Sequence, residues 1–169
     1  MDTQVAMNEA ARMITPVTLR ILIPVDATER SRWGARYARW RCRQGIAVEV
    51  ELLLVAEPVT NWEVLRFRTQ SEVARFQAER GQFLLEDAAQ PLLQAGIAVR
   101  VNYREGDVAF QILDTSEQLD CHEIVLPAPH SRWTRLLYQD VVRQVIQKQR
   151  GIPVVTVNAD GLPERALQG

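Results

Sequence analysis

The sequence predicts an α/β protein with a doubly wound, five-stranded parallel sheet and helices on both faces. Apolar runs typical of strands alternate along the chain with segments of helical periodicity. These runs are continuously apolar, which indicates strands buried on both faces of a parallel sheet. The expected strands cover 19–25, 46–55, 97–103, 123–126 and 152–157, and the expected helices cover 28–44, 71–95, 107–119 and 139–149.

Turn and capping signals delimit the first elements. Asp26-Ala27-Thr28 follows the first strand and starts a helix that ends before Gly45. The second strand leads, after an irregular stretch, into the long second helix. That helix ends at Gly96, a glycine in the position of a left-handed cap. Pro91 lies near its end and is expected to kink or fray the last turn.

The later elements are shorter. Asp107 is a favoured N-cap residue for the third helix, and apolar residues follow it on one side. The last strand is expected at the edge of the sheet, where an unpaired strand promotes aggregation unless something covers it. Antiparallel pairing with a second copy is the simplest cover, and a proline at the start of the strand suits an edge. The predicted dimer edge consists of Pro153, Val154, Val155, Thr156 and Val157.

Composition excludes several classes of protein. The 169 residues are about one domain, and a formal charge of −1 gives no support for a nucleic-acid partner. No apolar run is long enough to span a membrane, and the N-terminus does not resemble a signal peptide. Cys42 and Cys121 match no metal or redox spacing. We therefore expect a cytoplasmic protein with reduced thiols and without a metal, a membrane or a nucleic-acid partner.

Four segments in the right order resemble the universal stress protein family. They are Ile21-Leu22-Ile23-Pro24-Val25-Asp26, Arg104-Glu105-Gly106-Asp107-Val108-Ala109, Glu123-Ile124-Val125-Leu126 and Ile152-Pro153-Val154-Val155-Thr156-Val157. The resemblance implies strand order 3-2-1-4-5, an adenine nucleotide alpha hydrolase-like fold and a homodimer. It implies a family-like domain over 18–158, an N-terminal extension over 1–17 and a C-terminal tail over 159–169.

Many members of that family bind ATP through a glycine-rich segment after the fourth strand. Glycines there let backbone N–H groups approach the phosphates at a helix N-terminus. The corresponding segment here, 126–141, has no glycine. Pro127 and His130 stand at the first two glycine positions, and Gln139 and Asp140 replace the final pair after a spacer that is one residue short. Asp140 would cap the last helix with its own carboxylate where a phosphate would lie.

The resemblance places a nucleotide crevice, possibly degenerate, between the first and fourth strands. Its candidate residues are Pro24, Val25, Asp26, Ala27, Val55, Leu126, Pro127, His130, Arg132, Arg135, Gln139, Asp140 and Val141. Asp26 either contacts a ribose or a metal or caps the helix that follows. His130, Arg132 and Arg135 either gather an anion or are solvated loop residues. No catalytic set and no metal-ligand cluster is found.

We therefore expect a non-enzymatic stress-response or signalling homodimer that lacks the phosphate cradle, has no cofactor and acts through unidentified protein partners. The alternative is a switch that binds ATP or AMP with Mg²⁺, and a slow ATP hydrolase is disfavoured.

The first helix raises two further questions. Arg32, Arg36, Arg39 and Arg43 share one face, which we interpret as a solvated, salt-bridged face and not a nucleic-acid site. A small-residue seam suited to packing on the sheet is formed by Ser31, Gly34, Ala35, Ala38 and Cys42. Trp33 and Trp40 then point away from the sheet, so that residues 5–14 or a second subunit are expected to cover them. If the helix is phased differently, both tryptophans belong to the core.

Overall fold

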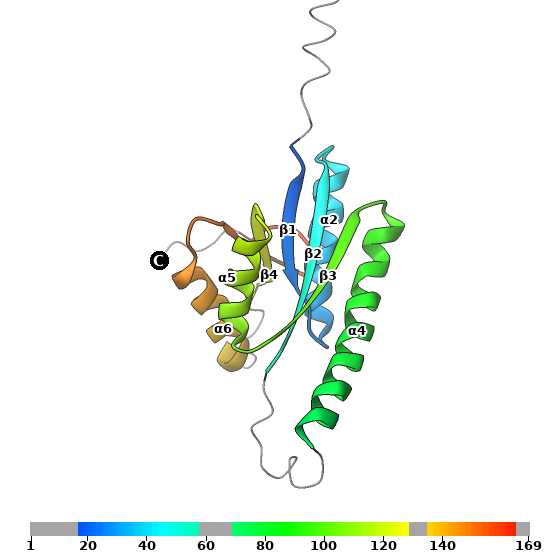
Figure 1. Cartoon of the computed structure of the whole chain (residues 1–169). Helices are drawn as coiled ribbons and strands as arrows, with labels where there is room; N and C mark the ends of the chain where they lie inside the picture. The colour runs from blue at the N-terminus through cyan, green and yellow to red at the C-terminus, as the bar shows by residue number, and fades with distance from the viewer. Residues whose placement is uncertain (1–16, 58–68, 129–134, 165–169) are drawn as a thin grey trace, which may run out of the picture.

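The computed structural model describes residues 17–57, 69–128 and 135–164, except for the side chains of 135–140. Its sheet is five-stranded and parallel throughout, with strand order β3-β2-β1-β4-β5, so the predicted fold class and strand order are confirmed (Figure 1). The strands are β1 (Leu19–Pro24), β2 (Val48–Ala56), β3 (Ala98–Glu105), β4 (Glu123–Pro127) and β5 (Val154–Val157). The helices are η1 (Glu29–Ser31, a 3₁₀ turn), α2 (Arg32–Arg43), α4 (Gln70–Gln94), α5 (Val108–Gln118) and α6 (Arg135–Lys148).

Helices cover both faces of the sheet. One core cluster joins α2 and α4 to β1, β2 and parts of the other strands, and it includes Ile23, Leu52 and Leu92. A second cluster joins α5 and α6 to the opposite face, around Leu22 and Ile112. Side chains alternate between the two faces along each strand, so adjacent residues of β1 lie in different clusters. Two buried layers of this kind explain the continuous apolar runs in the sequence.

Glycines fix two of the helix positions. A Cβ atom at Gly34 of α2 would lie 2.5 Å from Ile23 Cγ2, so the helix packs on β1 more closely than any other residue allows. At the end of α4, Gly96 has φ +74° and its N–H donates to Leu93 O, while Ile97 N donates to Leu92 O. This is the predicted left-handed cap, in its Schellman form. The helix continues past Pro91 to Gln94, so the expected fraying does not occur.

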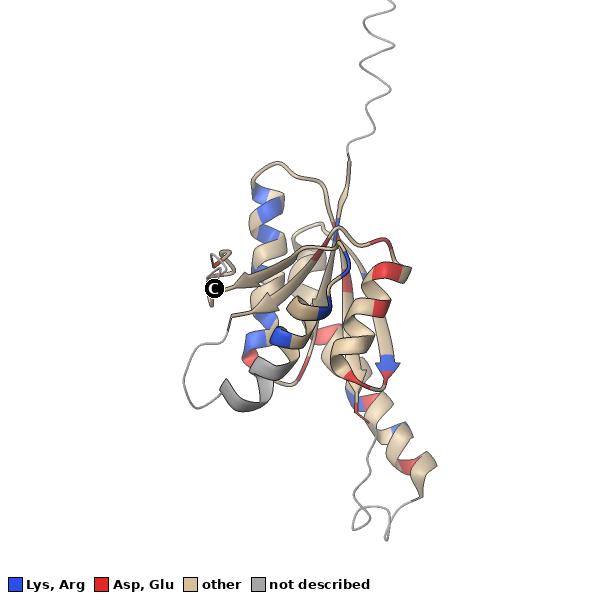
Figure 2. Ribbon diagram, turned by 90° about the vertical axis from the view of Figure 1, so that its left-hand side faces the viewer, with Lys and Arg blue, Asp and Glu red and all other residues tan. Residues whose placement is uncertain are grey.

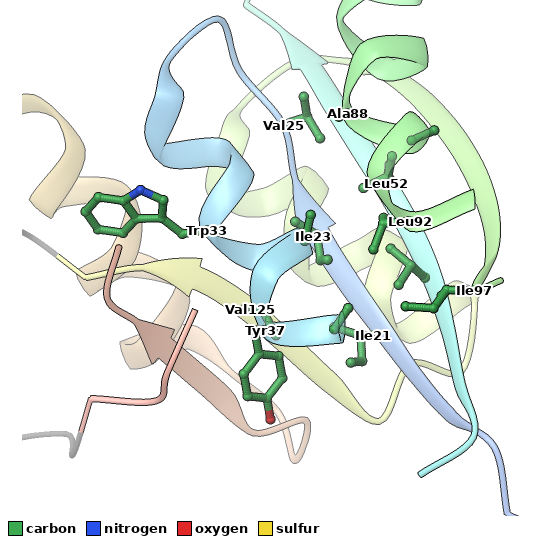
Figure 3. Close-up of a cluster of buried hydrophobic side chains, with 14 of the residues drawn as sticks. Ile21, Ile23, Val25, Trp33, Tyr37, Leu52, Ala88, Leu92, Ile97 and Val125 are labelled. Atoms are coloured by element: carbon green, nitrogen blue, oxygen red, sulfur yellow. The ribbon is translucent and has the colours of Figure 1, made fainter. Parts of the chain in front are cut away.

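The packing of α2 corrects one sequence-based prediction. Trp33 is only 6% exposed and belongs to the core, and Trp40 is half-buried against the same cluster. Figure 3 shows Trp33 and Tyr37 projecting from α2 toward the β4 side of the sheet. The sheet extends beyond β1 to β4 and β5, so α2 buries a wider face than the small-residue seam alone. The seam is buried except for Cys42, which is exposed, and residues 5–14 lie outside the described residues.

A polar network interrupts the apolar surface of β2 and β3. Glu51 is 1% exposed, and Arg100 Nε donates to its Oε1 at 2.6 Å while Asn102 Nδ2 donates to its Oε2 at 3.0 Å. Arg100 also lies 3.5 Å from Glu49. The register pairs Glu51 directly with Arg100 across the two strands. A charge this deeply buried is stable only with partners of this kind.

Candidate functional site

A cavity of about 420 Å³ lies at the carboxyl ends of β1 and β2, beneath the start of α5. This is the end of the sheet where ligands bind in doubly wound folds, and the volume suits a small molecule. The described lining is mostly apolar and comes from four elements or their flanking residues. It consists of Pro24, Val25, Asp26, Leu53, Val55, Glu57, Val108, Ile112 and Val141.

Among the described residues, the ionisable groups that line the cavity are two carboxylates. Asp26 follows β1, and its Oδ1 accepts hydrogen bonds from Thr28 N at 2.7 Å and from Thr28 Oγ1 at 2.5 Å. This turn fixes the carboxylate ahead of the first helical segment. The N-cap residue of that segment is Thr28, and no side chain caps it, so the capping role expected for Asp26 is wrong. Glu57 follows β2 in the same way. No described lysine or arginine lines this cavity.

The N-terminus of α5, next to the cavity, is already capped by an acidic side chain. Asp107 Oδ1 accepts a hydrogen bond from Phe110 N at 2.8 Å, which confirms the predicted cap. Its carboxylate therefore lies at the positive end of the helix dipole, where an external anion would otherwise bind.

The chain leaving β4 has its backbone groups occupied. Pro127 has no N–H, and the Ala128 N–H donates to Val157 O at 2.7 Å. The Ala128 carbonyl accepts a hydrogen bond from the guanidinium of Arg30, which also lies over the ring of Trp33, 5.3 Å from its centroid. Neither position therefore has an N–H free for a phosphate. The arginine ties the first helical segment to the end of β4.

The structure brings together some of the predicted crevice residues. Pro24, Val25, Asp26, Val55 and Val141 line the cavity. Ala27 instead lines a neighbouring hollow of about 290 Å³ between the β1–α2 turn and α4. Leu126 and Pro127 are buried in the sheet and do not line it. The loop residues His130 and Arg132, and the side chains of Arg135, Gln139 and Asp140, lie outside the described part of the chain. The expected start of the last helix at residue 139 is wrong, because α6 begins at Arg135. Asp140 therefore lies within the helix and does not cap its N-terminus.

The sequence analysis missed Glu57, Leu53, Val108, Ile112 and Arg30. Glu57 and Val108 had a usable signal, because residues that follow parallel strands, or begin the next helix, meet at one end of the sheet. Glu57 is the first residue after β2, and Asp26 is the second residue after β1. Arg30 had no such signal, since its contact with Ala128 joins residues 98 apart in the sequence.

Figure 2 marks the charged residues on the ribbon, and two of the α2 arginines form ion pairs, in agreement with the predicted salt-bridged face. Arg32 pairs with Asp87 at 2.8 Å and Arg36 pairs with Glu29 at 2.5 Å. Within the described ranges, no group of three or more histidine, cysteine or acidic residues has the arrangement of a metal site. None of the described helices combines the length and the apolar character that crossing a membrane requires.

The edge of β5 is paired with the chain's own C-terminal residues. Glu164 N donates to Thr156 O at 2.8 Å, and Val157 forms an antiparallel bridge with Pro163. Residues 163 and 164 of the predicted tail therefore pair with the edge of the sheet. The homodimer through Pro153–Val157 remains a prediction.

The family model of the universal stress proteins matches residues 18–158. The chain belongs to the universal stress protein family. The fold agrees with this assignment, since solved members have the same adenine nucleotide alpha hydrolase-like arrangement.

Solved structures resemble this family member at low sequence identity. A universal stress protein from Burkholderia pseudomallei matches with a TM-score of 0.64 and 16% identity, over 82% of this chain and 94% of that one. UspA from Lactobacillus plantarum matches with a TM-score of 0.67 and 17% identity, over 82% and 97%. One from Archaeoglobus fulgidus, solved in complex with dAMP, matches with a TM-score of 0.54 and 18% identity, over 82% and 97%. The search of curated proteins gave no match.

Proposed function

We propose that this universal stress protein is a non-enzymatic stress-response and signalling module that does not hold ATP in a phosphate cradle. It acts in the cytoplasm as a homodimer and through protein partners. The observation that supports this most directly is the end of β4. Pro127 has no N–H and the Ala128 N–H is bonded to Val157 O, where the family's ATP-binding members have glycine.

The charge of the cavity supports the same conclusion. Asp26 and Glu57 line it, and Asp107 caps the neighbouring helix. A phosphate brought within ~4 Å of one such carboxylate would be destabilised by about 1–4 kcal/mol, depending on the local dielectric. The described residues provide no compensating cation in the cavity lining, so they do not fit a triphosphate.

Calorimetric titration of the full chain with ATP, with and without Mg²⁺, tests the proposal. We expect no saturable heat, and we expect no release of inorganic phosphate on prolonged incubation. Binding at about micromolar strength, near −8 kcal/mol, would contradict the proposal and would point to His130, Arg132 and Arg135 as a substitute phosphate site.

A second candidate function, a switch that binds a nucleoside or AMP with Mg²⁺, is favoured by the cavity itself. Its apolar walls and volume of about 420 Å³ suit a base and a sugar, and its two carboxylates offer acceptors for hydroxyl groups or oxygen ligands for Mg²⁺. One similar structure is that of a universal stress protein in complex with cAMP, at 12% identity and a TM-score of 0.60.

Filling the cavity with a large side chain tests whether a nucleoside or AMP binds there or binds non-specifically elsewhere. Val55→Trp places a large side chain in the lining, whereas Val101→Trp makes the same change at a position that is 53% exposed on β3. If the cavity binds adenosine or AMP, Val55→Trp abolishes the heat of binding and Val101→Trp retains it. Equal heats from both variants would exclude this cavity as the binding site.

A further inference from the structure

The C-terminal residues after β5 fold back along the outer edge of the sheet. Glu164 N donates to Thr156 O at 2.8 Å and Asn158 N donates to Leu162 O at 3.0 Å, so residues 157 and 163 face each other as an antiparallel pair. The turn between them is closed by Asn158, whose Oδ1 accepts hydrogen bonds from Asp160 N and Leu162 N, both at 3.0 Å. We call residues 158–164 the edge segment.

The edge segment is also fixed to α2. Gly161 has φ +75°, and a Cβ atom built there would lie 2.5 Å from Arg36 Cβ and 2.6 Å from Tyr37 N. Arg36 Nη1 donates to the Ala159 carbonyl at 2.6 Å. The turn thus rests directly on the helix backbone, and only glycine satisfies both the backbone conformation and the contact.

The edge segment occupies one of the backbone groups that a second β5 strand would use, and it lies along the same edge. Along β5, Pro153 O and Val157 O accept hydrogen bonds from the β4 strand and the residue after it. Because backbone groups alternate between the two sides of a strand, Val154 and Thr156 direct their N–H and C=O groups to the free edge. The Thr156 carbonyl is bonded to Glu164. A strand of four residues is too short for both partners to pair with it at once.

We propose that the edge segment is a built-in block of the β5 edge, and that a second copy pairs there only after the segment has been displaced. This inference rests on the homodimer through β5 proposed above. The molecule then has two exclusive states, a blocked monomer and an open form that dimerises. The balance between them depends on the contacts of Gly161 and Glu164.

Two glycines provide a matched test in the full chain. Gly161→Ala and Gly96→Ala impose the same left-handed strain, at φ +75° and +74°, but a Cβ atom at Gly96 meets nothing within 4 Å. Sedimentation velocity over a wide range of concentration measures the dissociation constant of the dimer. We expect Gly161→Ala to lower it by about tenfold or more, a change of ~1.4 kcal/mol or more, and Gly96→Ala to leave it unchanged.

A second pair of variants avoids any clash with α2. Glu164→Pro removes the N–H that bonds Thr156 O, whereas Glu164→Ala keeps it. Glu164→Pro is expected to favour the dimer as Gly161→Ala does, and Glu164→Ala is expected to behave as the unmodified chain. Adding Thr156→Pro to Gly161→Ala removes an N–H that points to the free edge of β5, and it breaks no hydrogen bond to β4. Because a second β5 strand would need that N–H, the double variant should be a monomer.

The outcomes distinguish failure of the block from failure of the dimer. If all variants and the unmodified chain dimerise equally, the block is refuted and the dimer remains. If all are monomeric while amide exchange at Glu164 becomes fast in Gly161→Ala, the β5 dimer itself is refuted, and the block with it. A dimer of Gly161→Ala that persists with Thr156→Pro also refutes the block, because it forms at another surface.

Discussion

Removing either partner of the pair between Glu51 and Arg100 is expected to change the free energy of unfolding by a different amount. Glu51 is 1% exposed, whereas the Arg100 side chain is 61% exposed. Arg100→Leu leaves the carboxylate buried with Asn102 as its remaining donor. Loss of a hydrogen bond to a charged group costs about 1.5–3 kcal/mol. We therefore expect Arg100→Leu to lower the free energy of unfolding by about 1.5–3 kcal/mol. This is less than the roughly 3–5 kcal/mol lost when one partner of a fully buried pair is removed, because water reaches the position that the arginine leaves.

The reverse change is expected to cost much less. Glu51→Leu removes the buried charge, and Arg100 keeps both its access to water and its contact with Glu49 at 3.5 Å. Replacing a buried charge with an apolar residue is often neutral or stabilising, so we expect a loss below about 1 kcal/mol. Urea unfolding at neutral pH measures both variants, with Glu49→Leu as the control for a partly exposed carboxylate. A loss for Glu51→Leu equal to that for Arg100→Leu would refute the reasoning.

Three further predictions concern other positions. Burial and a hydrogen bond donated to Glu123 raise the pKa of Tyr37, so the unfolded chain ionises first and the free energy of unfolding falls as the pH rises above about 10. Tyr37→Phe should weaken that fall, and an unchanged fall would contradict this. Burial raises the pKa of Cys121 to about 11, so a thiol reagent at pH 8 should label exposed Cys42 first and label Cys121 only after unfolding. Equal labelling rates would contradict this. Gly34→Ala should unfold more easily than Gly81→Ala by about 1–3 kcal/mol, because its Cβ would lie at 2.5 Å from a neighbour instead of 3.0 Å. Urea unfolding decides their order.

The sequence predicted the elements whose determinants are local. Continuous apolar runs, the aspartate at 107 and the glycine at 96 placed strands, caps and helix ends within a few residues of their observed positions. The strand order came from the family resemblance. The part of the site that follows β1 was also accessible, because parallel strands bring their carboxyl ends to one side of the sheet.

Features that depend on distant residues were not accessible. The burial of Trp33 depends on how far the sheet extends under α2, and the helix alone does not determine this. Glu51 is stabilised by residues of β3, so its burial follows only once the register is known. The bond from Arg30 to Ala128 joins residues that are 98 apart in the sequence. The pairing of Glu164 with Thr156 depends on the turn between them. Neither contact produces a periodic pattern in the sequence.

The position of Gly161 on α2 also affects how the protein is made. Arg36 and Ala159 are bonded although 123 residues separate them. At a synthesis rate of about 5–20 residues per second, Arg36 is polymerised about 6–25 s before Ala159. During that interval the growing chain has the helix without the turn that rests on it. The nascent domain therefore presents an open helix surface to chaperones and to neighbouring chains until its last residues have been added.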